Sequence, residues 1–115
     1  MKTTFVLLGR VLDIPEEILP RLMQTHFPNT YVKIRIFGTD ITFQEDGLEL
    51  FLNSYDDRLY YLHVECPKQE TIEEICDRLA TLFEENKILY NMGWYEKDED
   101  GNPLTEDVNR IHPDW

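Results

Sequence analysis

The sequence predicts an α+β domain in which a mostly antiparallel sheet carries two helices on one face. Two segments, residues 16–27 and 71–85, repeat apolar residues at helical spacing. Between them, residues 31–65 alternate apolar and polar residues and are divided by short turns, as in an antiparallel meander. The chain has 115 residues, 42% of them hydrophobic, so we expect a single domain over residues 1–115.

The first elements are a strand and a helix. Residues 3–12 (TTFVLLGRVL) are apolar and β-branched, which predicts a buried strand. Asp13 and Pro15 are typical of a helix entry. Pro20 fits the helix that follows only in its first turn, where a backbone N–H is not needed. Pro28 and Asn29 then end the helix.

The meander has three predicted turns. Residues 31–37 form the first strand, with Val32, Ile34 and Ile36 on one side, and a turn follows at 38–40. Strands over 41–44 and 48–52 flank a turn at Glu45–Gly47, and residues 55–58 form the last turn before a strand over 59–65.

The second helix has the clearest periodic signal. Thr71 and Glu74 are spaced as a capping box, and the apolar residues behind them lie on one stripe. Residues 88–95 predict a final core strand. Residues 96–115 form an acidic hairpin or tail, in which 104–111 is the candidate for an added edge strand. The order β-α-β-β-β-α-β, with three or four strands between the helices, resembles a ferredoxin-like arrangement with an enlarged central meander, a resemblance of element order alone.

The net charge of −12 is the main indication of function. Residues 70–85 contain six acids against one arginine, and residues 96–115 contain seven against two basic residues. Such a chain repels nucleic acid and anionic membranes and attracts basic proteins or cations. The short apolar run at 5–8 does not predict a signal peptide, and no run has transmembrane length, so we expect a cytoplasmic protein.

One segment has the spacing of a cation site. Residues 96–107 place acids at positions 1, 3, 5 and 12 of a calcium-type loop and Gly101 at position 6. Position 1 is Glu rather than Asp, position 12 is the short Asp107, and no helix is predicted before the loop. We therefore favour an acidic β-hairpin over a weak divalent-cation site.

Catalytic and cofactor motifs are not found. The sequence has no Gly-x-Ser-x-Gly elbow, no phosphate-binding glycine cluster and no histidine at zinc-ligand spacing. Cys66 and Cys76 are expected to be free thiols, with a disulfide as the less favoured alternative. We therefore expect a protein that is not an enzyme and needs no cofactor or metal.

These observations predict a small protein-binding domain, an inhibitor or immunity-type protein that blocks a basic nuclease or nucleic-acid-binding partner by electrostatic mimicry. An alternative is a small-molecule-binding or regulatory module with a pocket between sheet and helices. The predicted partner-binding residues are two aromatic anchors and the acids beside them: Trp94, Tyr95, Asp98, Glu99, Asp100, Glu106 and Asp107. The alternative acidic surface is on the second helix: Glu73, Asp77 and Glu84.

Overall fold

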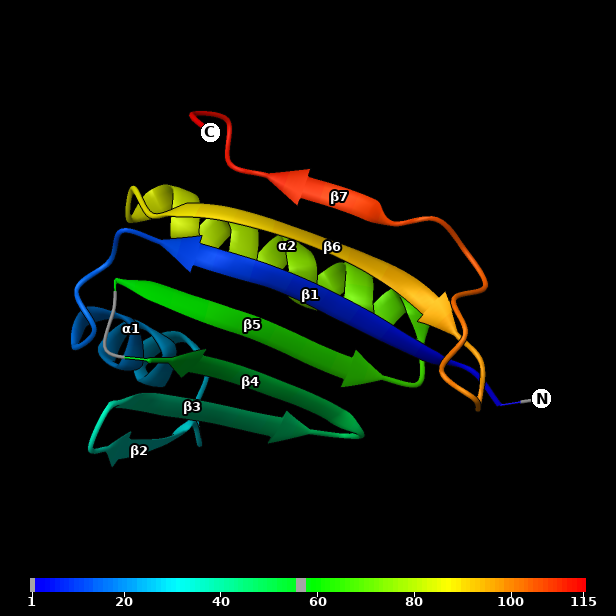
Figure 1. Cartoon of the computed structure of the whole chain (residues 1–115), viewed down its shortest axis with the longest axis horizontal. Coiled ribbons are helices and arrows are strands. Elements are labelled where there is room, and N and C mark those ends of the chain that lie inside the picture. Colours follow the sequence, from blue (N-terminus) through cyan, green and yellow to red (C-terminus); the bar gives the residue numbers. More distant parts are fainter. Residues whose placement is uncertain (1, 56–57) are drawn as a thin grey trace.

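A computed structural model of the chain describes residues 2–55 and 58–115, and it shows an α+β fold with seven strands and two helices (Figure 1). In chain order the elements are β1 (Thr4–Leu12), α1 (Ile18–His26), β2 (Tyr31–Arg35), β3 (Gly38–Glu45), β4 (Leu48–Ser54), β5 (Leu59–Cys66), α2 (Gln69–Glu85), β6 (Leu89–Lys97) and β7 (Val108–Ile111).

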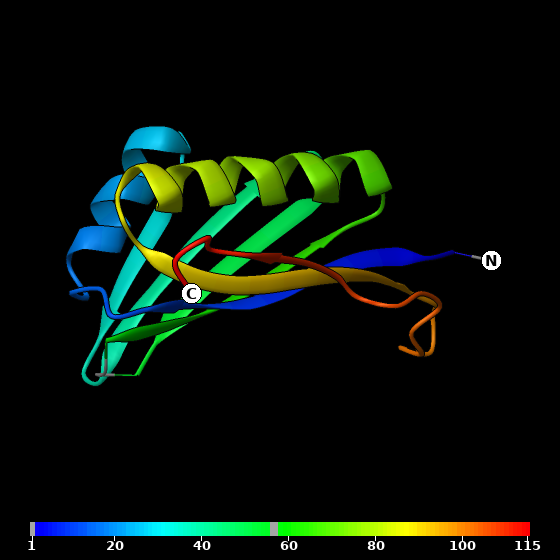
Figure 2. The same cartoon turned by 90° about the horizontal axis from the view of Figure 1, so that it is seen from above.

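All seven strands form one antiparallel sheet in the order β2-β3-β4-β5-β1-β6-β7. The N-terminal strand β1 therefore lies between β5 and β6. Both helices cover the same face of the sheet, and no element of the described chain covers the opposite face (Figure 2). We refer to these two sides as the covered face and the open face.

The core lies between the covered face and the helices. In β1, Leu7 and Val11 are fully buried there, whereas Leu8 points to the open face and is 45% exposed. The apolar residues predicted to lie along one side of α2 are buried, and they form the helix side of the core. The C-terminal tail also returns to the domain, since His112 is buried with its ring edge-on to Tyr90, 5.6 Å between centroids.

Helix α1 confirms the prediction for Pro20. Glu17 is the N-cap residue, so Pro20 lies in the first turn, where its missing N–H costs no helical hydrogen bond. The capping box predicted for α2 is wrong. The helix begins at Gln69, its N-cap is Lys68, and no side chain caps it, so Thr71 and Glu74 already lie inside the helix.

The sheet differs from the prediction in the position of one turn and in its overall arrangement. The first turn of the meander lies at residues 36–37 rather than 38–40, because Gly38, with a φ of 133°, already pairs with Arg35 as the first residue of β3. The four segments predicted as strands between the helices form β2 to β5, so four rather than three strands separate the helices. The candidate edge strand within 104–111 is confirmed as β7, which pairs with β6. The resulting strand order does not establish the predicted ferredoxin-like arrangement. Neither helix is long and apolar enough to cross a membrane.

Candidate functional site

The acidic segment after β6 is a hairpin, as predicted. Lys97 forms a β-bridge with Pro103, and the Leu104 N–H donates to the carbonyl oxygen of Glu96 at 2.7 Å. The segment then continues into β7, which pairs with β6. Figure 2 shows this connection at the end of the sheet where the N-terminus lies.

The Asp98 carboxylate stabilises the tip of that hairpin by accepting backbone hydrogen bonds. Its Oδ1 accepts the backbone N–H groups of Asp100 and Asn102, both at 2.9 Å. These bonds, that from Asn102 first, lower the pKa of the Asp98 carboxyl because they stabilise its charged form. Asp98 therefore has a structural role in the turn. Within residues 2–55 and 58–115, no group of three or more His, Cys, Asp or Glu side chains is placed to hold a metal ion.

The remaining predicted acids of the connection differ in their contacts. Glu99 accepts the backbone N–H of Lys2 at 3.0 Å. Asp100, Glu106 and Asp107 are exposed and form no ion pair with the described part of the chain. These three carboxylates are the ones available to a partner.

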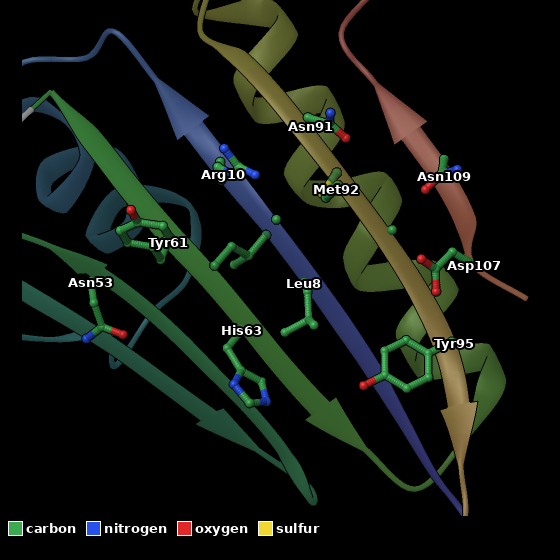
Figure 3. Close-up of a pocket in the computed structure, with 13 residues that line it drawn as sticks. Leu8, Arg10, Asn53, Tyr61, His63, Asn91, Met92, Tyr95, Asp107 and Asn109 are labelled. Carbon is green, nitrogen blue, oxygen red and sulfur yellow. The ribbon is translucent and has the colours of Figure 1, made fainter. Parts of the chain in front are cut away.

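The two predicted aromatic anchors point in opposite directions. Trp94 lies on the covered face, is 9% exposed and packs edge-on against Phe5 with 6.0 Å between ring centroids. Tyr95 lies on the open face beside Asp107 (Figure 3). Alternate residues of a strand face opposite sides of a sheet, so the pair cannot form one surface. Trp94 is a core residue, and we do not retain it as an anchor.

The alternative acidic surface on α2 is largely engaged within the protein. Asp77 accepts from Arg110 of β7 at 2.9 Å, and Glu84 accepts from the hydroxyl of Tyr90 and lies 3.9 Å from Arg110. Glu73 accepts from Gln69 at 2.8 Å. The contacts of Asp77 and Glu84 fasten β6 and β7 to the helix, which leaves these carboxylates less available to a partner.

The open face contains a groove that the sequence did not predict. It has a volume of about 510 Å³ and runs across strands β4, β5, β1, β6 and β7 (Figure 3). Its lining combines amides, aromatic rings and charged groups. The side chains that define it are Leu8, Arg10, Asn53, Tyr61, His63, Asn91, Tyr95, Asp107 and Asn109.

The strand register arranges these side chains in rows. Arg10 pairs with Tyr61 on one side and with Asn91 on the other, and Asn53 pairs with Tyr61. Directly paired side chains on one face lie about 5 Å apart at Cβ, so these four residues form a continuous row across the groove. The adjacent row contains His63, Leu8, Gly93 and Asn109.

Gly93 leaves space that the side chain of Asn109 occupies. A Cβ at position 93 would lie 2.6 Å from Oδ1 of Asn109, so Asn109 can extend over β6 into the lining of the groove only because residue 93 is a glycine. The floor is formed by Leu8 and by backbone near Gly9 and Met92.

Charge in and beside the groove is unevenly distributed. Arg10 is exposed and makes no ion pair with any residue in the described ranges, and Asp107 is the single acid that lines the groove. Glu65, on the same face, accepts from Nζ of Lys97 at 2.8 Å, and that hydrogen bond lowers the pKa of its carboxyl.

Sequence reasoning found Tyr95 and Asp107 but missed most of this site. The available signal was asparagine: residues 53, 91 and 109 are three of the chain's six asparagines and all occur within strands. Asparagine is depleted in strands, so three in one sheet call for an explanation beyond strand formation. Arg10 in the predicted first strand was a further sign.

Comparison with known proteins adds no identification. No protein-family model matches the sequence, and no curated protein matches it significantly.

Proposed function

We propose that this protein is a small protein-binding domain of the inhibitor or immunity type, which binds a basic partner through the acidic β6–β7 connection. The observation that supports the proposal most directly is that Asp100, Glu106 and Asp107 remain exposed and unpaired within the described chain, while other acids of the two clusters are used internally.

The charge distribution supports the same surface. Residues 98–107 contain five acids and no lysine or arginine. Clustered carboxylates of this kind can take the place of phosphates in a basic cleft and accelerate association with a basic protein. Tyr95 stands beside Asp107 at the end of the groove and supplies an aromatic contact next to the charged rim.

The test compares two triple variants that each remove three negative charges. The first is Asp100→Asn, Glu106→Gln and Asp107→Asn. The matched control is Glu45→Gln, Glu74→Gln and Glu85→Gln, which changes exposed acids elsewhere on the molecule. Each variant and the natural protein are used as bait in a lysate of the organism that encodes the chain, at low and high salt.

We expect a basic protein that the natural chain and the control capture at low salt and release at high salt, and that the first variant captures at least about tenfold less. Equal loss in both variants would indicate attraction by net charge alone. Undiminished capture by the first variant would exclude the β6–β7 connection as the recognition surface.

A further inference from the structure

The groove on the open face has features that a basic protein partner does not explain. One end of it carries Arg10, in the row with Tyr61 and Asn91, and a basic surface would be repelled there. Asp107, the one acid among the lining residues, lies towards the other end, in the β6–β7 connection (Figure 3). The Arg10 end of the groove is therefore a site of different chemistry from the acidic rim.

No described carboxylate neutralises the charge of Arg10. Arg35, Arg58 and Arg110 each form an ion pair with an aspartate at 2.9 Å, whereas Arg10, Arg21 and Arg78 form none with residues 2–55 or 58–115. Of these three, Arg10 is the one that lines the groove, where it projects from β1 in the middle of the sheet. A planar guanidinium without a carboxylate, set in a groove, is suited to a carboxylate from outside the chain.

The amide side chains around Arg10 complete the lining. Asn91 and Asn109 form no side-chain hydrogen bond with described parts of the protein, and Asn53 donates to Asp40 at 2.7 Å. Each amide can both donate and accept, which matches the hydroxyl group of a sugar. The rings of Tyr61 and Tyr95 offer apolar faces on the same side of the sheet, and Tyr61 is 46% exposed.

We propose that the groove binds an acidic saccharide, with the carboxylate of a uronic acid at Arg10 and sugar hydroxyls at Asn91 and Asn109. The volume of about 510 Å³ is in the range of small-ligand sites. Gly93 leaves space above β6 for the side chain of Asn109, so that this amide belongs to the lining of the groove.

The surroundings favour a carboxylate over a phosphate. Phosphate sites use several backbone N–H groups at a helix N-terminus or a nest, often with more than one cation. In this groove the strands use their backbone N–H groups in the sheet ladder, and Arg10 and His63 are the basic side chains of the lining. A single negative charge is therefore the better match.

The length of the groove favours a ligand longer than one amino acid. Arg10 pairs with Asn91, and Tyr95, beside Asp107, lies four residues further along β6, about 13 Å at the usual rise per residue. An α-amino acid carries its ammonium and carboxylate on one carbon and cannot reach both charged groups. A disaccharide has hydroxyls along its whole length and can contact both ends.

The test is a titration of the ¹⁵N-labelled protein, followed by amide chemical shifts, with disaccharides in which one uronate (galacturonate, glucuronate or mannuronate) is linked to a neutral hexose. Neutral disaccharides of the matching hexoses and acetate serve as comparison ligands. We expect at least one uronate disaccharide to shift amides around Arg10, Tyr61 and Asn91, and to bind at least about tenfold more tightly than its neutral counterpart and than acetate.

Three variants locate the binding. Arg10→Gln should weaken the uronate at least about tenfold, whereas Arg21→Gln, which removes an exposed arginine of α1, should not. Gly93→Ala should weaken binding because the added Cβ displaces the Asn109 side chain, and it should leave the remaining spectrum unchanged. An unchanged spectrum away from the groove will show that each variant is folded.

Four results would overturn the proposal: no shift at the groove with any of the three uronates, equal binding of neutral and acidic disaccharides, equal binding of acetate, or equal weakening by Arg10→Gln and Arg21→Gln. Neither Arg10 nor Gly93 belongs to the protein-binding surface proposed above, so either proposal can fail without the other.

Discussion

The two faces of the sheet are built from the same strands but differ in how far their side chains are buried. On the covered face β1 contributes Leu7 and Val11, which are completely buried under the helices. On the open face the same strand contributes Leu8, which is 45% exposed, and Arg10. The covered-face residues contribute most of the stability, because the free energy gained by burial scales with the apolar area removed from water. The open-face residues contribute less to stability and are available for contacts with other molecules.

The neighbouring residues Leu7 and Leu8 provide the largest expected contrast. Leu7→Ala should lower the free energy of unfolding by about 3 kcal/mol, since it removes a fully buried side chain and leaves a cavity. Leu8→Ala should lower it by less than about 1 kcal/mol. Urea unfolding of both variants measures the difference. Similar losses would mean that the open face is covered in solution, for example by a second copy of the chain.

Gly9 and Gly93 extend the comparison of the two faces to substitutions with a smaller expected effect on stability. On the covered face, a Cβ added to Gly9 would lie 2.6 Å from Cβ of Met92 and 2.7 Å from the carbonyl oxygen of Asn91, so β6 would have to move. Gly9→Ala should therefore cost about 1–3 kcal/mol. On the open face, the atom nearest to a Cβ at Gly93 is the end of the Asn109 side chain, which can rotate away.

Gly93→Ala should consequently change the free energy of unfolding by no more than about 0.5 kcal/mol. Thermal and urea unfolding of the two glycine variants, side by side, provide the measurement. A loss for Gly93→Ala as large as that for Gly9→Ala would show that Asn109 is held rigidly above Gly93, and that the groove is less adaptable than its exposure indicates.

The covered face could be predicted from the sequence far better than the open face. Burial imposes a period on apolar residues, so the stripe of α2 and the position of Pro20 followed from spacing alone. The pairing of the strands could not be predicted in this way, because nothing in the periodicity of β1 indicates that β5 and β6 flank it. Without that pairing, Arg10 could not be placed between Tyr61 and Asn91.

The prediction of the partner-binding surface was also incomplete, because it rested on counting charged residues. A cluster of acids does not reveal which carboxylates are bound internally, and Asp98 and Asp77 both are. The error over Trp94 was avoidable, however. Residues 88–95 were predicted as a strand, and alternation alone places Trp94 and Tyr95 on opposite faces. Asparagine is depleted in strands, so the asparagines of the predicted strands, taken together with strand alternation, would have indicated which side of the sheet is the open face.

The two faces should also respond to opposite extremes of pH. On the covered face, burial first and the bond to Glu84 second raise the pKa of Tyr90 to about 12. The unfolded chain ionises near 10.0, so this stabilisation is complete below pH 10 and is lost as the pH rises towards 12. On the open face, the pKa of Glu65 is lowered by Lys97, so its contribution is present above about pH 4.5 and is lost as the pH falls through the folded-state pKa.

Tyr90→Phe should therefore reduce the fall in unfolding free energy between pH 9 and 11, and Glu65→Gln should reduce the fall between pH 5 and 3. The alkaline effect should be the larger, since the Tyr90 side chain is fully buried while Glu65 is about one-third exposed and its ion pair is screened by solvent. Tyr60 and Cys76 also have raised pKa values, so the Phe variant will reduce the alkaline fall without removing it. Urea unfolding across the pH range tests both variants. A larger effect from Glu65→Gln than from Tyr90→Phe would mean that ionic contacts on the open face contribute more to stability than its exposure implies.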